Sequence, residues 1–185
     1  MSHRHSLIIA ALTVMACIAA TGCAREELAN APITPFTLDI VPSKSFGDTA
    51  SITMAYNKPG DFYVVLTNVS NEPQAVWETW NSWGYQTIYF KFAMADGPKS
   101  VVSMKQQDFT RNGPSTFVIQ PEEHQVYSTR LNEKWEAHPT VRKADEMPIK
   151  VQAIYDVPMT AEAPQHNVWT GHVESKTYSL VLRQW

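Results

Sequence analysis

Apolar and polar residues alternate with a period of two along much of the chain from residue 36 onward. In the segment 36–40 the first, third and fifth residues are apolar, and the two between them are polar. The segment 50–56 places Ala, Ile, Met and Tyr on one face, and the segment 62–70 is rich in β-branched residues. Because successive side chains of a strand point to opposite faces, these segments are predicted to be strands with a buried face. Further strands are predicted at 74–80, 85–94, 101–105, 117–119, 125–131, 149–156, 172–175 and 178–183.

Turn-forming residues separate these segments. The stretches 57–61, 70–73 and 95–99 are rich in Asn, Asp, Gly, Pro and Ser, and the last is the clearest hairpin signal. Twelve prolines interrupt the chain, and no window has the 3.6-residue period of an amphipathic helix. The segment 130–147 is the least regular and has room for one helical turn. Short strands with frequent turns predict an all-β fold, an antiparallel β-sandwich over residues 36–185.

The first 22 residues have the pattern of a secretory signal. A short start carrying Arg4 precedes an apolar stretch, residues 7–20, without a charged side chain. A basic start followed by a short apolar stretch is typical of a cleaved leader. The apolar stretch is shorter than the roughly 20 residues that a transmembrane helix needs. Residues 1–22 are therefore predicted to be a signal peptide.

The end of this stretch, Ala20-Thr21-Gly22-Cys23, resembles the lipobox of bacterial lipoproteins, although leucine is commonest where Ala20 stands. The resemblance implies that Cys23 receives a diacylglyceryl group and that signal peptidase cuts before it. Residues 23–35 would then be a polar tether, and the membrane is an expected partner. By the same resemblance, Ala24 rather than aspartate after the cysteine favours the outer membrane if the source is Gram-negative. The alternative is a plain secretory signal with an incidental cysteine.

Charge and cysteine content narrow the range of functions. The formal net charge is −3, and removal of Arg4 with the signal peptide takes away one positive charge, to −4. Without a clustered basic surface, no nucleic-acid partner is expected. Cys17 lies inside the signal peptide, so Cys23 would be the only cysteine left and no intramolecular disulfide is predicted. The histidines lack a metal-binding spacing, and neither a metal nor another cofactor is expected.

Three stretches resemble bacterial immunoglobulin-like domains. FYVVLTNVSNEP at 62–73 is similar to a core strand and its turn, VQAIYD at 151–156 to a late strand, and VWTGHVESKTYSLVL at 168–182 to the last hairpin. The resemblance implies an immunoglobulin-like sandwich and carries no catalytic residue. The Cys…Trp…Cys spacing of true immunoglobulin domains is absent. A more distant likeness is to the bacterial intracellular proteinase-inhibitor fold, whose activity does not transfer to an envelope protein.

The segment 76–92 is rich in aromatic residues and contains three tryptophans. In the strand predicted at 85–94, Ile88, Phe90, Phe92 and Met94 lie on one face, which should be its core face. Trp77 and Trp80 are interpreted as core residues, because large aromatic rings supply much of the buried area of such a domain.

A bend is predicted inside this aromatic segment. Asn81-Ser82 and Gly84 break the strand pattern and would re-aim the side chains that follow. Trp83 and Tyr85 are therefore placed at a loop edge, where they are candidates for contact with a ligand. The competing interpretation is that these rings only close the end of the sandwich.

Two further polar sets are candidates. Arg111 and Asn112, beside Gly113, could form a polar clamp for a ligand, although a turn uses the same residue types. A second set consists of Asp156, His166, His172 and Glu174. These side chains could converge at one end of a sandwich, although ordinary solvated side chains on loops explain them better.

These observations predict a lipid-anchored protein of the bacterial cell envelope with a non-catalytic binding or scaffolding role. The expected partner is another envelope protein or a glycan. No residue is assigned a catalytic role, because no nucleophile or acid–base motif stands out. Two alternatives stay open: an enzyme whose site is assembled from loops, and an inhibitor of an envelope protease.

Overall fold

The computed structural model describes residues 34–42, 44–46, 49–54, 60–94, 99–137 and 146–184. The predicted signal peptide, the lipobox and nearly all of the predicted tether lie outside these residues. The described part is all-β, as predicted, with one short 3₁₀ helix, η1 (Pro164–His166). No helix in it is long and apolar enough to cross a membrane.

The predicted strands are all found, with ends displaced by at most three residues. The three-residue strand β2 was not predicted. The strands are β1 (Phe36–Pro42), β2 (Lys44–Phe46), β3 (Thr49–Met54), β4 (Gly60–Asn68), β5 (Gln74–Trp77), β6 (Ile88–Met94), β7 (Lys99–Val102), β8 (Thr116–Ile119), β9 (His124–Leu131), β10 (Glu146–Val157), β11 (Gly171–Glu174) and β12 (Tyr178–Gln184).

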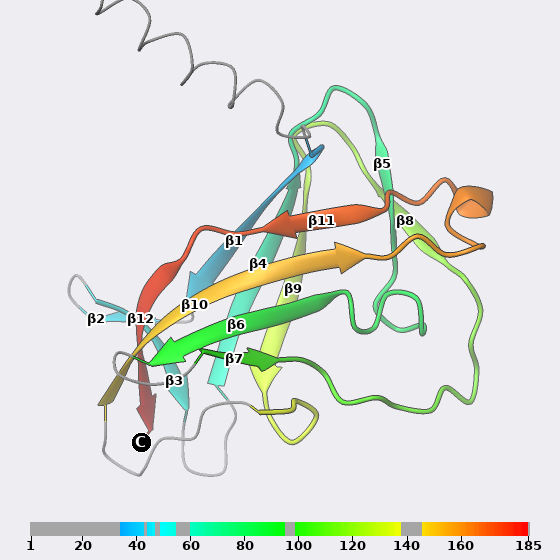
Figure 1. The fold of residues 1–185 in the computed structure, drawn as a ribbon. Coiled ribbons are helices and arrows are strands. Elements are labelled where there is room, and N and C mark those ends of the chain that lie inside the picture. The colour runs from blue at the N-terminus through cyan, green and yellow to red at the C-terminus, as the bar shows by residue number, and fades with distance from the viewer. Residues whose placement is uncertain are drawn as a thin grey trace, which may run out of the picture. The chain divides into compact units, whose positions relative to one another are not determined.

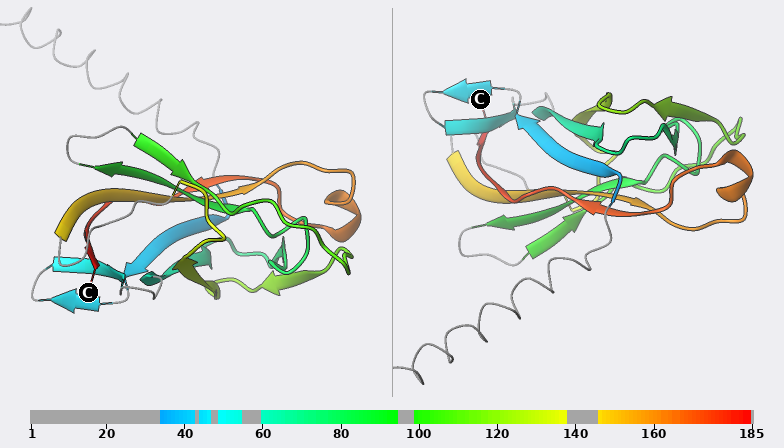
Figure 2. Two further views of the ribbon diagram at one scale, coloured as in Figure 1. Left: turned by 90° about the horizontal axis from the view of Figure 1, so that it is seen from below. Right: turned by 90° about the horizontal axis from the view of Figure 1, so that it is seen from above.

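The strands form three sheets (Figure 1). One sheet has the order β1-β4-β9, and a larger one has the order β2-β3-β12-β10-β6-β7, with β11 also paired to β10. β5 and β8 form a separate two-stranded sheet. Figure 2 shows the layered arrangement, with β1 in one layer and β6 and β7 in the other.

Strand pairing is antiparallel throughout these sheets except at one place. β12 runs parallel to β3, with Val181 opposite Ser51. The predicted antiparallel pairing is thus found at the other strand pairs of these sheets and not at this one. Parallel neighbours need a long crossover connection, and here the chain between β3 and β12 passes through most of the other strands.

The hydrophobic core lies between the two larger sheets. On β4, Phe62, Val64 and Leu66 are fully buried and point to this core, as the two-residue period requires. The Phe62 ring meets the Phe90 ring of β6 edge-on, with centroids 5.1 Å apart. Complete burial of a side chain of this size contributes about 1.5–3 kcal/mol to folding. The facing sheets are therefore held together by direct packing of their inner side chains.

The predicted core face of β6 is confirmed over most of its length. Ile88, Phe90 and Phe92 are buried, whereas Met94, at the end of the strand, is 42% exposed. β6 begins at Ile88 rather than at residue 85, because residues 82–86 are already part of a turn. That turn borders the candidate site.

Candidate functional site

The chain leaves β5 after Trp77 and turns back on itself; we call residues 78–87 the aromatic bend. Asn81, which is fully buried, organises it. Its Oδ1 accepts hydrogen bonds from the backbone N–H groups of Trp83 (3.1 Å) and Gly84 (3.0 Å). Its Nδ2 donates to the carbonyl of Ser115 (3.1 Å). A single amide thus closes the turn and ties it to the loop before β8, as Asn side chains often do in turns.

Gly84 allows the bend to close tightly. A Cβ at this position would lie 2.2 Å from the carbonyl oxygen of Glu78 and 3.0 Å from the Cβ of Trp77. Any larger residue would push the two arms of the bend apart. The Tyr85 N–H also donates to the Asn81 carbonyl at 3.0 Å, so Tyr85 is held at a defined place beside β6.

The tryptophans of this segment are arranged differently from the expectation. Trp77 is a core residue, 1% exposed, as predicted. Trp83 is half-buried and packs on Trp77 with ring centroids 5.9 Å apart. Trp80 is 53% exposed, and its Nε1 donates to Glu78 Oε2 at 2.5 Å. The interpretation of Trp80 as a core residue is therefore wrong. Of the two interpretations of Trp83, the packing role agrees with the structure, because the turn at Asn81 folds Trp83 back over β5.

Arg111 and Asn112 do not form a clamp together. Asn112 Oδ1 accepts a hydrogen bond from the Ser82 N–H at 3.0 Å, and its Nδ2 donates to Ser82 Oγ at 2.8 Å. The Asn112 amide therefore joins the loop before β8 to the aromatic bend. Arg111 is exposed beside it. Of the two, Asn112 has a structural role that its position in the sequence did not reveal.

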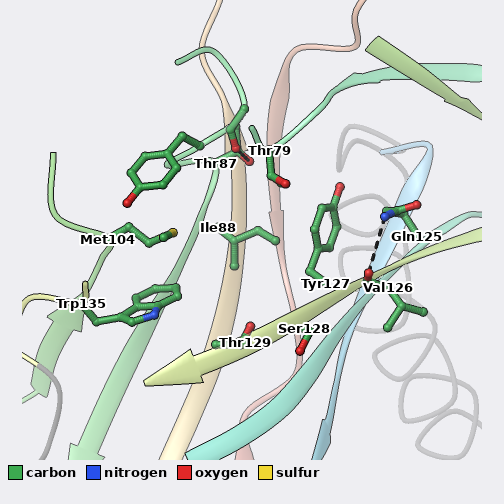
Figure 3. A pocket seen from close by; sticks show the side chains of 12 residues that line it. Thr79, Thr87, Ile88, Met104, Gln125, Val126, Tyr127, Ser128, Thr129 and Trp135 are labelled. Atoms are coloured by element: carbon green, nitrogen blue, oxygen red, sulfur yellow. Dashed lines mark hydrogen bonds between the residues drawn. The ribbon is translucent and has the colours of Figure 1, made fainter. Parts of the chain in front are cut away.

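A pocket of about 290 Å³ opens between the aromatic bend and β9 (Figure 3). Tyr85 is the predicted site residue that lines it, and the Tyr85 ring is held edge-on against Phe109 with centroids 5.5 Å apart. The pocket is lined by Thr79, Gly84, Tyr85, Thr87, Ile88, Met104, Gln125, Val126, Tyr127, Ser128, Thr129 and Trp135.

Two distant segments build one wall of this pocket. Met104 and Trp135 face each other in an isolated antiparallel bridge. Backbone hydrogen bonds flank it, from Lys105 N–H to the Lys134 carbonyl at 2.7 Å and from Glu136 N–H to the Ser103 carbonyl at 2.8 Å. The Trp135 ring also packs on Phe90, with centroids 5.4 Å apart. Figure 3 shows Met104 and Trp135 across the pocket from Tyr127.

Tyr127, on β9, lines the pocket, and its hydroxyl is buried. Its side chain is only 8% exposed, and its ring stacks on that of Tyr155 with centroids 6.2 Å apart. Each phenol affects the pKa of the other, yet neither hydroxyl has a hydrogen bond of normal geometry. Burial raises the pKa of both phenols well above its usual range. Both hydroxyls are therefore neutral at physiological pH.

Tyr127 is also the first ring of an aromatic series through the core. Tyr155 stacks on Trp169 with centroids 6.1 Å apart and an interplanar angle of 11°. Trp169 in turn meets Phe36 edge-on at 5.2 Å. This continuous packing restricts rotation of the Tyr127 ring, so the position of its hydroxyl is well defined.

Sequence reasoning missed most of the pocket. Thr79, Met104, Tyr127 and Trp135 come from four separate segments, and none belongs to a recognisable motif. Tyr127 did carry a weak signal, since it shares the buried face of a predicted strand while having a polar tip. The other three required knowledge of the loop pairing.

Three members of the predicted His/Asp/Glu set do converge, on strands rather than loops. His172 lies 3.5 Å from Asp156 and 3.0 Å from Glu174, and Lys91 Nζ lies 2.6 Å from Glu174. Hydrogen bonds from Lys91 and then His172 lower the pKa of Glu174. His166 is elsewhere, with its ring centroid 5.5 Å from that of Trp77.

The geometry of this exposed cluster, Lys91, Asp156, His172 and Glu174, does not suit a metal ion. Within the described ranges, no three or more His, Cys, Asp and Glu side chains are arranged to hold a metal ion. The close partner of Glu174 is a lysine ammonium, which repels a cation. The cluster is an exposed set of polar contacts across β6, β10 and β11 around the Lys91–Glu174 ion pair, and exposed ion pairs contribute little to stability.

Comparison with known proteins identifies no family. No family model matches the chain, and no curated protein matches it significantly. Among solved structures, the chain is similar to Spo0M, a sporulation control protein from Bacillus subtilis, with 13% sequence identity and a TM-score of 0.36. The match covers 82% of this chain and 50% of that chain, so this chain spans about half the length of Spo0M. At this TM-score the similarity carries no argument about fold or function.

Proposed function

We propose that this chain is a lipid-anchored protein of the bacterial cell envelope whose immunoglobulin-like β-sandwich binds a small molecule without catalysing a reaction. The lipobox resemblance at Ala20 to Cys23 supports the anchor. Two sheets that face each other across a shared core support a sandwich. The finer assignment to immunoglobulin-like domains rests on the three stretches that resemble them.

The observation that carries the binding function is the pocket between the aromatic bend and β9. Three aromatic residues, Tyr85, Tyr127 and Trp135, line it together with three threonines. Ligand sites typically combine apolar walls with a few fixed polar groups, and volumes near 300 Å³ are at the lower end of their range. The polar groups here are hydroxyls and one amide, which suit hydrogen bonding to a ligand.

The anchor would confine this pocket near the membrane surface. A diacylglyceryl group with a further acyl chain gives stable attachment, whereas a single chain binds reversibly. A tether over residues 23–35 would reach at most about 45 Å when extended. The protein would therefore meet ligands at the surface of its membrane, and Ala24 favours the outer membrane if the source is Gram-negative.

The anchor is tested by metabolic labelling. Bacterial cells that produce the full chain are fed an alkyne analogue of palmitate, and the purified protein is examined for label and by mass spectrometry. The wild type and Cys17→Ser should be labelled and should begin at Cys23, whereas Cys23→Ser should be unlabelled. Unmodified protein that begins downstream of Cys23 would contradict the lipoprotein proposal.

Binding is tested separately by saturation-transfer NMR of the purified full chain with a library of small neutral and charged compounds. We expect compounds that bind the wild type and fail to bind Thr79→Trp, because a large ring at the exposed Thr79 position fills the pocket mouth. If no compound in the library binds the wild type and fails to bind Thr79→Trp, the binding proposal is contradicted. Chemical turnover of a bound compound would instead support the enzyme alternative.

A further inference from the structure

We propose that the pocket binds an extended peptide, which pairs as an added strand with the free edge of β9 and directs one uncharged side chain toward Tyr85 and Met104. This inference rests on the proposed binding function and names the ligand of the same pocket. Three observations carry it: backbone groups of β9 face the pocket, this edge lacks the protection found on other edge strands, and the lining carries no charge.

The pocket runs along one edge of β9. Five consecutive residues of this strand, 125–129, line it. Successive side chains of a strand point to opposite faces, and Val126 and Ser128 carry their side chains on the exposed outer face of β9. What these two residues contribute to the lining is therefore mainly backbone. β9 is the last strand of its sheet, and β4 is its neighbour on the other side.

The hydrogen-bond pattern shows which backbone groups point away from β4. The Asn68 N–H donates to the Glu123 carbonyl at 3.0 Å, where the pairing of β4 with β9 begins. In an antiparallel pair, residues that bond to the neighbouring strand alternate with residues whose N–H and C=O point outward. The odd-numbered residues of β9 therefore bond to β4, and Val126 and Ser128 direct their backbone groups to the free edge.

These outward groups are available to a further strand. Within the described ranges, the N–H groups of Val126 and Ser128 make no backbone hydrogen bond outside the ladder with β4. The Val126 carbonyl accepts from Gln125 Nε2 at 3.5 Å (Figure 3), beyond the usual range of about 2.7–3.2 Å. A peptide N–H could replace this weak contact, and a peptide carbonyl could accept from the Ser128 N–H. Main-chain bonds of this kind supply the affinity when a peptide adds to a sheet edge.

The central part of β9 lacks the features that keep exposed strand edges unpaired. Such edges are typically short, or they carry lysine or proline. β7, at an edge of the larger sheet, has four residues and begins with Lys99, and β1, the other edge of the β9 sheet, ends at Pro42. β9 has eight residues, and its stretch 125–129 contains neither a charge nor a proline. This edge is thus open to pairing.

The opposite wall of the pocket limits the partner to a single strand. Met104 and Trp135, joined by their bridge, lie across the pocket from Tyr127 (Figure 3). An added strand would lie about 4.8 Å from β9, in the space of the pocket. A second copy of the chain would have to bring a whole sheet edge and its own aromatic bend into the same space. One extended segment of about five residues matches the five residues of β9 that line the pocket.

The lining selects an uncharged, apolar side chain. None of the described residues that line the pocket has a charged side chain at neutral pH. A charged group would lose its water on entry without meeting an opposite charge, which is costly. Tyr85 and Met104 are half-buried at the pocket, and methionine adapts to side chains of different shapes. The charged ends of a free peptide would find no partner here either, so the ligand is an internal segment of a longer chain.

The test uses the full-length, ¹⁵N-labelled chain in detergent. The probes are pentapeptides with capped ends, threonine at the outer four positions and a variable central residue. Valine, leucine or methionine at the centre should shift the Val126 and Ser128 amide signals saturably and slow hydrogen exchange at Ser128 by about tenfold or more. The Tyr127 amide, which faces β4, should exchange at an unchanged rate. Lysine or glutamate at the centre, or uncapped ends, should weaken binding by about tenfold or more.

Single changes in the peptide and in the chain test the strand pairing itself. Methylation of one peptide amide at a time should weaken binding at every second position, because alternate N–H groups of an added strand face β9. Ser128→Pro removes an edge N–H and should weaken binding by about tenfold. Proline is tolerated on an edge strand where the N–H faces away from the neighbouring strand. Ser128→Ala keeps this N–H and changes only an outward side chain, so it should bind as the wild type does.

Several results would overturn the inference. If no capped peptide binds while another compound is excluded by Thr79→Trp, the ligand class is wrong but the proposed binding function stands. If neither binds, the binding function fails as well.

Other results would overturn the strand pairing alone. If a peptide binds without slowing exchange at Ser128, or if methylation shows no two-residue period, the peptide is not an added strand. The methylated peptides decide this even if Ser128→Pro does not fold. If sedimentation shows a dimer that the peptides dissociate, a second copy of the chain occupies the edge instead.

Discussion

Trp83 packs on Trp77 with ring centroids 5.9 Å apart, although Trp80, three residues earlier, is 53% exposed. The turn at Asn81 reverses the chain, so that Trp83 lies over β5 while Trp80 remains on the outside of the bend. Aromatic pairs of this kind contribute about 0.5–1.5 kcal/mol beyond the area that they bury. The packing role in this segment thus belongs to the later of the two tryptophans.

This arrangement predicts which tryptophan matters for stability. Trp83→Ala should lower the free energy of unfolding by about 3 kcal/mol, at the lower end for a large aromatic residue because Trp83 is only half-buried. Trp80→Ala should change it by no more than about 0.5 kcal/mol, as is usual for exposed positions. Urea denaturation of the two variants and the wild type measures both. Equal losses in the two variants would mean that the bend is packed differently.

Gly84 and Gly113 make a second matched comparison. A Cβ at residue 84 would lie 2.2 Å from a backbone carbonyl oxygen, whereas one at residue 113 would meet nothing within 4 Å. Gly84→Ala should therefore destabilise the domain by about 1–3 kcal/mol or more, since backbone must move to make room. Gly113→Ala should be nearly neutral. Thermal melts of both variants decide this, and a neutral Gly84→Ala would show that the bend is less tightly closed.

The strands were predictable because a local signal specifies them. On β1, Phe36, Leu38 and Ile40 are buried and alternate with exposed residues, as the sequence pattern requires. One face of the strand is buried, and the resulting alternation can be read from neighbouring residues of the sequence alone. β2 and the parallel pairing of β3 with β12 carry no comparable signal, because strand order depends on contacts between distant segments.

The candidate site was harder to predict for the same reason. Trp80 and Trp83 have similar local surroundings in the sequence, and what separates them is the turn that Asn81 closes through the Trp83 and Gly84 N–H groups. The same side chain is tied to the Ser115 carbonyl, 34 positions along the chain, a contact that the local sequence does not reveal. Tyr85 was chosen as a site residue and does line the pocket. Its partners across the pocket, Tyr127 and Trp135, come from strands and loops that only the fold brings near.

The link between the aromatic bend and the loop before β8 gives a third prediction. Asn112→Ala removes both hydrogen bonds to Ser82 and should lower the free energy of unfolding by about 1 kcal/mol. It should also speed hydrogen exchange at the Ser82 amide, because that N–H loses its acceptor. Arg111→Ala, at the exposed neighbouring position, should change neither quantity. Hydrogen exchange followed by NMR is the measurement, and an unchanged Ser82 rate in Asn112→Ala would contradict the link.

The ion pairs around Glu174 predict a specific dependence of stability on pH. Hydrogen bonds from Lys91 and His172 lower the pKa of Glu174 in the folded chain below its ordinary value of 4.5. A carboxyl group with a lowered folded pKa stabilises the fold above its unfolded pKa, and this contribution is lost as the pH falls through the folded pKa. Its side chain is 36% exposed, so solvent screening keeps the effect small.

Glu174→Gln should therefore melt at a slightly lower temperature than the wild type at pH 7, and the difference should close as the pH falls from about 5 toward 3. The difference should also shrink in high salt, because salt screens exposed charges. Glu133→Gln, at an exposed glutamate in the turn before Trp135, controls for the loss of one negative charge and should show no such trend. Calorimetric melts across this pH range provide the comparison. A deficit of Glu174→Gln that persists unchanged at pH 3 would assign the role of Glu174 to packing between β10 and β11 instead of to its charge.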